Sequence, residues 1–329
     1  MSPMVTEAML KAVTAYTSVQ AVTPELGVSS PMWSDDQEDQ LDRNGVADER
    51  IEQLKEREMG PLLFPSSFSL PPGLRPLLLR LLFIATAQRR MTQSIWSLAV
   101  TIMNTYLSRI SQEGVSTDVI IGMLPAKCIA ILRLAWKHDG SSRGHDHDSW
   151  VPNLIKLEQY MQSLGYRVTP DMTKRTLEDH EKDVLFHLNW TLDLPFVEKW
   201  LALYWPRLNI LTKYAHQDIV SCMEQQMMRL AQVLAMAAGD LRARDVSLAL
   251  FCLALHWAKL LPSQFCVDSK SQQVKAGFQV QMTTWEGSEA LTTAEVELVA
   301  MASLEEITSA TDLVLNGLAE GASRNHHQV

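Results

Sequence analysis

The stretch that decides the fold of this chain is CIAILRLAW, residues 128–136. Wound as a helix of 3.6 residues per turn, it carries apolar side chains on nearly every side. One face holds Cys128, Ile131, Leu132, Ala135 and Trp136, and the opposite side holds Ile129 and Leu134. A helix that is apolar almost all round is surrounded by other elements. The stretch therefore predicts the central helix of an all-α domain.

A second stretch of the same kind lies later in the chain, at Val246–Leu261. It is again apolar almost all round, and Ala243-Arg244 before it matches Ala126-Lys127 before the first stretch. Between the two stretches, Pro195 breaks the helical pattern, because the residue before a proline is disfavoured in a helix. Two central helices on either side of a proline junction predict two similar helical bundles in tandem.

Amphipathic segments flank both central stretches and supply the neighbours that they need. Their apolar residues recur at the spacing of a helix with one buried face. In the first half, the predicted helices are Leu74–Ala85, Ile95–Leu107, Asn153–Leu164 and Thr173–Leu188. In the second half, they are Phe196–Trp205, Asp218–Ala237 and one or two helices between Thr292 and Leu318. Thr92 or Ser94 can cap the helix that contains Ile95.

The predicted division of the chain has four parts. Residues 1–47 hold a short helix at Ala8–Tyr16 and a flexible acidic linker. Residues 48–195, which open with a short helix at Glu49–Glu58, form the first bundle, and residues 196–318 form the second. Residues 319–329 form a disordered polar tail.

Composition narrows the class of protein. The chain has 329 residues, of which 47% are hydrophobic, and a formal net charge of −9, which argues against a surface built for nucleic-acid phosphates. The four cysteines (Cys128, Cys222, Cys252 and Cys266) lack metal-site spacing and are expected to be reduced core thiols. The longest apolar run, near Leu77–Ala85, is interrupted by Arg80, and the N-terminus lacks a secretion signal. We therefore expect an intracellular protein, nuclear and/or cytoplasmic, without a membrane partner.

Catalytic and cofactor motifs are not readable in the sequence. A loop with His138-Asp139 and His145–Asp148 is the one metal-like cluster, but its glycines and serines favour a solvated insertion, so no metal site is expected. Neither a Gly-x-Ser-x-Gly elbow nor a Gly-rich phosphate loop is present. Trp136, Trp190 and Trp200 are expected to be packed in the core. We therefore expect a non-enzymatic protein that needs no cofactor.

Four fragments of the first half, in order, resemble the cyclin family. Leu74–Leu82 is similar to the first cyclin-box helix, and Ile95–Val100 with Tyr106–Ser108 is similar to the second, which ends in a Phe-Leu-Ser step. Leu134–Lys137 resembles the Ala-Ser-Lys end of the third helix. Leu177–Pro195 resembles the fifth helix and its Leu-x-Phe-x-Leu-x-x-Pro exit. The match covers residues 74–205, and the second half matches only by pattern.

The resemblance implies two tandem five-helix cyclin-like folds that bind and activate a cyclin-dependent protein kinase. It implies effects on the cell cycle, on transcription or on both. In cyclins, a lysine that ends the third helix and a glutamate in the fifth contact the mobile regulatory helix of the kinase. Those positions are Lys137 and Glu181 here. Opposite charges on adjacent helix ends can fix the register of a partner helix.

Some residues depart from the family pattern. The resemblance places a peptide-docking groove at Leu74, Leu78 and Leu81, but Leu81 stands where cell-cycle cyclins carry a tryptophan. Asn104 and Thr105 replace an aspartate and an arginine of the second helix. Such departures suit a specialised, virus-encoded or transcription-type cyclin, and the sequence does not separate these.

Two functions from other classes remain as alternatives. One is a factor of the same double fold that binds nucleic acid or the transcription machinery, which the net charge of −9 disfavours for nucleic acid. Duplex DNA binding at low salt would distinguish it. The other is a helical enzyme with a buried cavity, which turnover without a kinase would reveal.

Overall fold

The computed structural model describes residues 46–58, 78–79, 81–83, 85–86, 91–138, 150–168, 174–237, 241–265, 267, 269–287 and 290–326. Helices dominate these residues and no strand occurs among them, so the all-α prediction is confirmed. The chain divides into two compact units. The middle unit lies within Gly60–Phe196, and the outer unit comprises the described residues 46–58 and 197–326.

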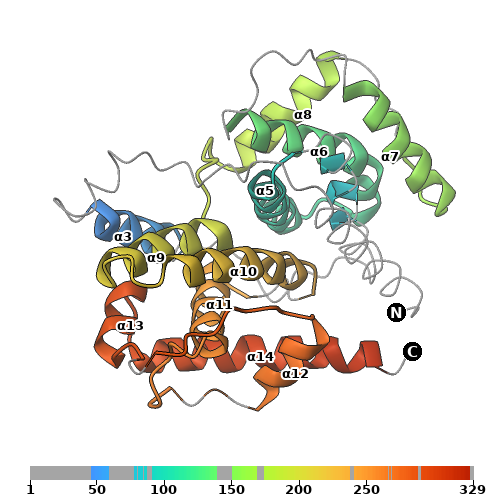
Figure 1. The fold of residues 1–329 in the computed structure, drawn as a ribbon. Helices are drawn as coiled ribbons and strands as arrows, with labels where there is room; N and C mark the ends of the chain where they lie inside the picture. Colours follow the sequence, from blue (N-terminus) through green and yellow to red (C-terminus); the bar gives the residue numbers. More distant parts are fainter. Residues whose placement is uncertain are drawn as a thin grey trace. The chain divides into compact units, whose positions relative to one another are not determined.

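The middle unit is built around one long helix. Its labelled helices are α5 (Gln93–Gln112), α6 (Thr117–His138), α7 (Val151–Ser163) and α8 (Lys174–His187). Residues 78–79, 81–83 and 85–86 are helical as well. Figure 1 shows α6 among the others, and it packs against α5, α7 and α8. This is the predicted central helix.

Burial along α6 has the predicted all-round pattern. Every residue from Cys128 to Ala135 is buried, including Arg133. The helix also begins earlier than expected, at Thr117. In its first two turns, the side chains of Ile120 and Leu124 are buried. Pro125 lies inside it without ending it, although a proline removes one helical hydrogen bond.

The length of α6 bears on the expectation that no apolar segment of the chain is long enough to span a membrane. Asp118–His138 is long and apolar enough to cross a membrane by length and composition, which the broken run at Leu77–Ala85 did not suggest. Most of its apolar window, 78%, is buried inside the protein, as in the core helix of a soluble protein. The segment is therefore weak support for a membrane span.

Local signals explain where the helices of the middle unit begin and end. Thr92, not Ser94, is the N-cap of α5, and its hydroxyl accepts a hydrogen bond from the Ile95 amide at 3.4 Å. After α8, Asn189 and Trp190 adopt positive φ angles of 50° and 59°, which turn the chain toward Pro195.

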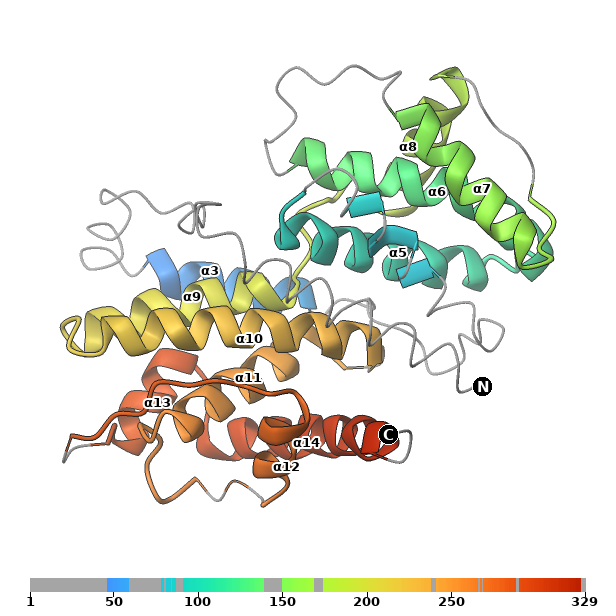
Figure 2. The ribbon, with the colours of Figure 1, turned by 45° about the vertical axis from the view of Figure 1, so that its right-hand side comes forward.

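The outer unit also contains one buried helix with other helices around it. Its helices are α3 (Val46–Glu58), α9 (Val197–Leu211), α10 (Gln217–Ala237), α11 (Ala243–Trp257), α12 (Lys270–Gly277), α13 (Thr293–Ala300) and α14 (Leu304–His326). Figure 2 shows α11 between α10 and α14, and α11 also packs against α9. Nearly every residue of α11 is buried, as the sequence predicted.

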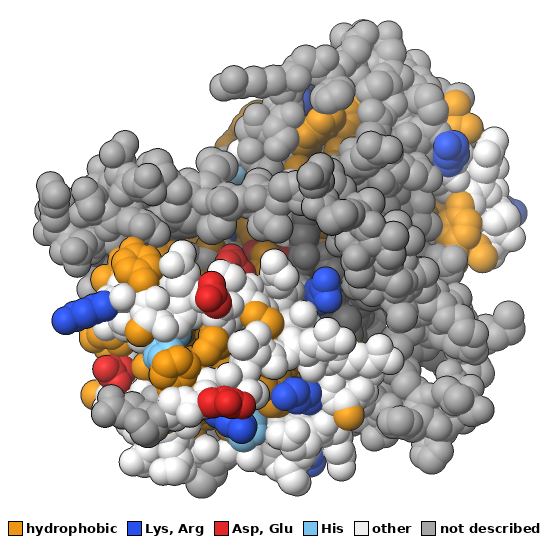
Figure 3. Space-filling model, in the orientation of Figure 1, with side chains coloured by type: hydrophobic (Ala, Val, Ile, Leu, Met, Phe, Trp, Pro, Cys, Tyr) orange, Lys and Arg blue, Asp and Glu red, His pale blue; other side chains and the backbone are white. Residues whose placement is uncertain are grey.

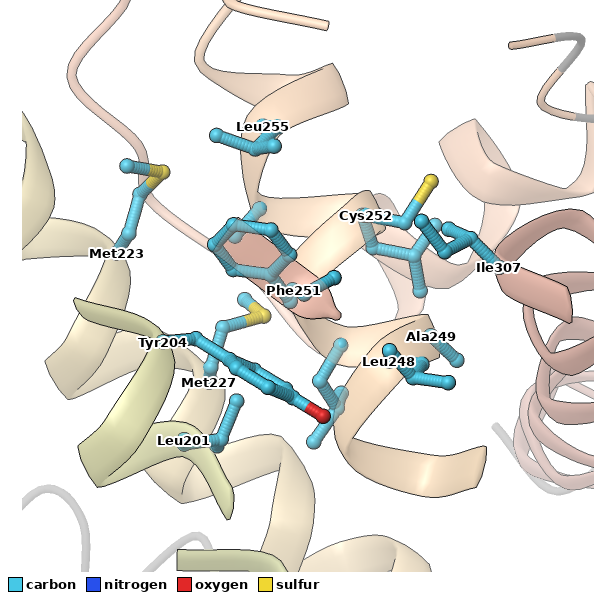
Figure 4. Close-up of a cluster of buried hydrophobic side chains, with 14 of the residues drawn as sticks. Leu201, Tyr204, Met223, Met227, Leu248, Ala249, Phe251, Cys252, Leu255 and Ile307 are labelled. Carbon is cyan, nitrogen blue, oxygen red and sulfur yellow. The ribbon is translucent and has the colours of Figure 1, made fainter. Parts of the chain in front are cut away.

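Aromatic and sulfur side chains fill the core of the outer unit. In Figure 4, Phe251 of α11 points toward Tyr204 of α9 and Met227 of α10, and its ring centroid lies 5.3 Å from that of Tyr204. Cys252, the next residue, points the other way, toward Ile307 of α14. Consecutive residues of α11 therefore bury against different helices.

Three features of the outer unit differ from the predictions. α3 buries Ile51 and Leu54 in the core that contains α9, although residues from 48 onward were assigned to the first bundle. α12 forms between the predicted stretches Val246–Leu261 and Thr292–Leu318, where no helix was predicted, and α14 continues to His326 through most of the predicted disordered tail. The predicted helix Ala8–Tyr16 and the acidic linker lie outside the described residues.

Candidate functional site

Lys137 and Glu181, the two residues that the cyclin resemblance singled out, meet in the structure. Lys137 lies in the last turn of α6 and Glu181 in the middle of α8, and the Lys137 Nζ donates to Glu181 Oε2 at 2.7 Å. The Lys137 side chain is 49% exposed, whereas that of Glu181 is 9% exposed. The ammonium is therefore within reach of another molecule, while the carboxylate is largely shielded.

Arg133 is a third member of this site that sequence analysis missed. It lies one turn before Lys137 on α6, and its Nε is 3.1 Å from Glu181 Oε1. This is an ion-pair distance without hydrogen-bond alignment, since Oε1 accepts no hydrogen bond. The available signal was one arginine within an otherwise apolar stretch, because a buried cation needs a counter-charge. Glu181 thus faces two cations of α6.

A second group of polar side chains joins α8 to α5 and α6. The Lys127 Nζ donates to Asp183 Oδ2 at 2.5 Å, and the Tyr106 hydroxyl donates to the same oxygen at 2.9 Å. The Lys127 ammonium also lies 5.2 Å from the centre of the Tyr106 ring. Lys127 and Tyr106 are both buried.

The electrostatics of this second group follow from its geometry. Burial alone would raise the pKa of Asp183, but the hydrogen bond and charge of Lys127, the Tyr106 hydroxyl and His187 together lower it. Burial, and next the charge of Asp183, raise the pKa of Tyr106. At neutral pH, Asp183 is therefore a carboxylate and Tyr106 a hydrogen-bond donor.

His187 extends the group to the end of α5. Its Nδ1 is 2.7 Å from the Asp183 carbonyl oxygen and its Nε2 is 3.2 Å from Glu113 Oε2, beside the C-terminus of α5. Contacts from α5 and α6 therefore hold α8 at Asp183 and at His187, which lie two and six residues after Glu181. The position of Glu181 depends on this packing.

Two aromatic side chains are exposed at the end of α8. Phe186 is 69% exposed and Trp190 is 66% exposed. The prediction that Trp190 is packed was wrong, because the left-handed turn at Asn189-Trp190 leads its side chain away from the core. Trp200 is buried as predicted. Trp136 is partly buried and lies edge-on to Trp150, with 5.3 Å between the ring centroids. Exposed aromatics of this size are a feature of protein-binding surfaces.

Two of the three residues of the predicted peptide groove, Leu78 and Leu81, fall among the described residues. Leu78 and Leu81 are 1% and 0% exposed, so they are core residues of the middle unit. Leu74 lies outside the described residues. Helical spacing places Leu78 and Leu81 on one face, but that face packs inward.

The described residues give little support for a metal site or for a reactive thiol. These ranges contain no group of three His, Cys, Asp or Glu side chains that could hold a metal, and the loop 139–149 lies outside them. Cys128, Cys222 and Cys252 are free thiols, and Cys266 is outside the described residues. Burial raises the pKa of Cys128 to about 12 and that of Cys252 to about 11, so neither is a thiolate nucleophile.

Comparison with known proteins leaves the family of the chain open. No model of a known protein family matches the sequence. A search of curated proteins also finds no match.

Proposed function

We propose that this chain is a cyclin-like regulatory subunit that binds and activates a cyclin-dependent protein kinase through α6 and α8 of the middle unit. The observation that carries the proposal is the Lys137–Glu181 pair, which joins the two positions named by the resemblance at 2.7 Å. The same resemblance suggests that both units are cyclin-like folds. It also favours a role in the nucleus, the cytoplasm or both, in the cell cycle or transcription.

The mechanism that we propose is a shift of population and needs no active site in this chain. A protein that binds the active placement of the kinase regulatory helix better than the inactive one shifts the kinase toward activity. The size of the shift equals the difference in binding free energy between the two placements, and a few kcal/mol suffice. Lys137 supplies a charged contact, and the exposed rings of Phe186 and Trp190 supply apolar area.

Affinity capture with variants of the pair tests the proposal. We expect the full chain to capture an identifiable cyclin-dependent kinase from cell lysate and to raise the activity of that kinase when both are purified. Lys137→Met and Glu181→Gln should each weaken capture at least about tenfold, because we expect kinase binding to bury this pair, and losing one member of a charge pair buried in an interface costs about 2–5 kcal/mol.

Lys182→Met is the matched control, since Lys182 is an exposed cation on the same helix and pairs with Asp179 at 3.7 Å. Capture of the kinase at wild-type strength by folded Lys137→Met and Glu181→Gln variants would refute the site. Failure of the wild-type chain to bind any such kinase would refute the function.

A nucleic-acid-bound factor of the same fold is less well supported. On the face of the outer unit that Figure 3 shows, acidic and basic side chains are mixed among apolar and neutral ones. With a net charge of −9, the chain offers no electrostatic reason to bind phosphate backbones. Binding to duplex DNA at low salt would favour this alternative.

A further inference from the structure

At the contact between α6 and α8, one buried carboxylate lies close to two cations. The Glu181 carboxylate lies 2.7 Å from the Lys137 ammonium and 3.1 Å from the Arg133 guanidinium. One anion therefore faces two cations. A buried carboxylate needs one counter-charge, because an isolated charge in a shielded site is strongly unfavourable.

The two cations differ in access to solvent. The Arg133 side chain is only 7% exposed, so solvent reaches little of it. Lys137 is half-exposed, and its ammonium has three donor hydrogens, of which the Glu181 contact takes one. Arg133 is therefore the fixed counter-ion and Lys137 the one that can leave.

We propose that Arg133 is a positioning residue: it neutralises Glu181, so that the Lys137 ammonium can exchange Glu181 for an acceptor group on a bound protein. Glu181 Oε1 is buried and accepts no hydrogen bond, so it has a free lone pair with which Arg133 can align when Lys137 departs. Exchange then strands no buried charge. The role of Lys137 in binding rests on the proposed function. The pairing of Glu181 with both Arg133 and Lys137 does not depend on that function.

A matched control exists on the same two helices. Lys127 is also a buried cation of α6 that pairs with a carboxylate of α8, but its partner is Asp183. Replacing Lys127 removes another ion pair of a buried cation, although its carboxylate is 41% exposed, and leaves Glu181 with both of its cations. Arg133→Met and Lys127→Met thus separate the sharing of Glu181 from the general loss of a buried charge.

The first test measures the effect of Lys137→Met on hydrogen-exchange protection of the α8 amides in the full chain, in three backgrounds. In the wild-type and Lys127→Met backgrounds, we expect Lys137→Met to lower protection less than about threefold, because Arg133 still neutralises Glu181. In the Arg133→Met background, we expect a loss of at least about tenfold, because the carboxylate is then stranded. Equal losses in all three backgrounds would overturn the proposal.

Two further results keep the test decisive if Arg133→Met does not fold. A large loss of protection from Lys137→Met in the wild-type chain would overturn the proposal by itself, since Glu181 would then depend on Lys137. Arg133→Lys, which keeps the charge, should restore the small effect of Lys137→Met, and a tenfold loss in that background would also count against it.

Binding supplies the second test. Once a kinase is identified, Arg133→Met should weaken its capture at least about tenfold more than Lys127→Met does, and Arg133→Lys should retain most of the affinity. Equal weakening by Arg133→Met and Lys127→Met would assign Arg133 a stabilising role only. If no kinase is captured, the proposed function fails, and the exchange experiment still decides whether Arg133 holds Glu181.

Discussion

At the scale of the residue, the unusual feature is the charge inside the central helix of the middle unit. Lys127 and Arg133 are both buried among apolar neighbours on α6. Each would be strongly unfavourable alone, and each meets a carboxylate on α8, Asp183 and Glu181 respectively. The two ion pairs specify which face of α8 packs on α6, because a rotated or shifted α8 would leave charges buried without partners.

The Lys127–Asp183 pair gives a stability prediction. Lys127→Met should lower the free energy of unfolding of the middle unit by about 1–3 kcal/mol, because it leaves the Asp183 carboxylate without its ammonium partner, although the Tyr106 hydroxyl still donates to it. The expected loss is smaller than for a fully buried pair, because the Asp183 side chain is 41% exposed and partly hydrated. Urea unfolding of Lys127→Met, Asp183→Asn and the double variant measures the coupling. Additive losses would show that the pair contributes no coupling energy.

The same pair gives a pH dependence. The pKa of Asp183 is lowered in the folded chain, against the effect of burial, by Lys127, Tyr106 and His187. The unfolded chain, in which an aspartate has a pKa of about 3.9, therefore takes up this proton first as pH falls. The stabilisation is complete above that value and is lost as pH falls through the folded pKa. Between pH 6 and pH 3, we expect the stability difference between wild type and Asp183→Asn to shrink, and a constant difference would contradict this.

At the scale of the element, hydrogen bonds at the helix ends set several boundaries. α13 begins with a capping box, in which the Glu295 amide donates to the Thr292 hydroxyl at 3.2 Å and the Thr292 amide donates to the Glu295 carboxylate at 2.7 Å. At its other end, Arg207 of α9 donates to the carbonyl oxygens of Leu298 and Val299. A helix of eight residues is thereby held at both ends.

We expect Thr292→Ala to lower the free energy of unfolding of the outer unit by about 1 kcal/mol, because it leaves the Glu295 amide without its cap. Thr292→Ser keeps the hydroxyl and should cost only a few tenths of that. Thermal or urea unfolding of the two variants provides the measurement. Equal losses would indicate that the methyl group of Thr292, not its hydroxyl, matters.

At the scale of the whole molecule, the chain is divided between two units, each with its own buried helix, α6 or α11. The division does not follow the order of the sequence, because α3 precedes the middle unit in the chain and packs in the outer one. Its contribution is Ile51 and Leu54, which lie in the same cluster as Trp200 and Leu208 of α9. The outer unit is therefore assembled from two separate pieces of chain.

Removal of the α3 anchor tests this assembly. Ile51→Ala should destabilise the outer unit by about 2–4 kcal/mol, the usual loss for truncating a fully buried isoleucine. In hydrogen exchange, amides of α9 and α11 should lose protection, while those of α5 and α6 should change little. Leu157→Ala, on a buried residue of α7, is the reciprocal control and should affect the middle unit. Loss of protection in both units from either variant would mean that they unfold as one.

The candidate site could be predicted only in part. Lys137 and Glu181 came from the resemblance, since two charged residues 44 positions apart carry no local signal of contact. Arg133 was visible as a charge in an apolar stretch, but its partner was not. The exposure of Trp190 depends on two consecutive left-handed residues, neither of which is a glycine, and sequence patterns rarely reveal such a turn.

The sequence by itself determined the helical class and the two central helices, because hydrophobic periodicity is a local property that each segment carries in its own residues. It also narrowed the N-cap of α5 to Thr92 or Ser94 and marked the proline junction at Pro195, for the same reason, and the structure then selected Thr92. Only the tertiary structure decided in which unit α3 packs, which carboxylate pairs with each buried cation of α6, and which aromatic side chains are exposed to solvent. These outcomes depend on contacts between segments far apart in the chain. The free energy of such a contact depends on both segments, so neither sequence predicts it alone.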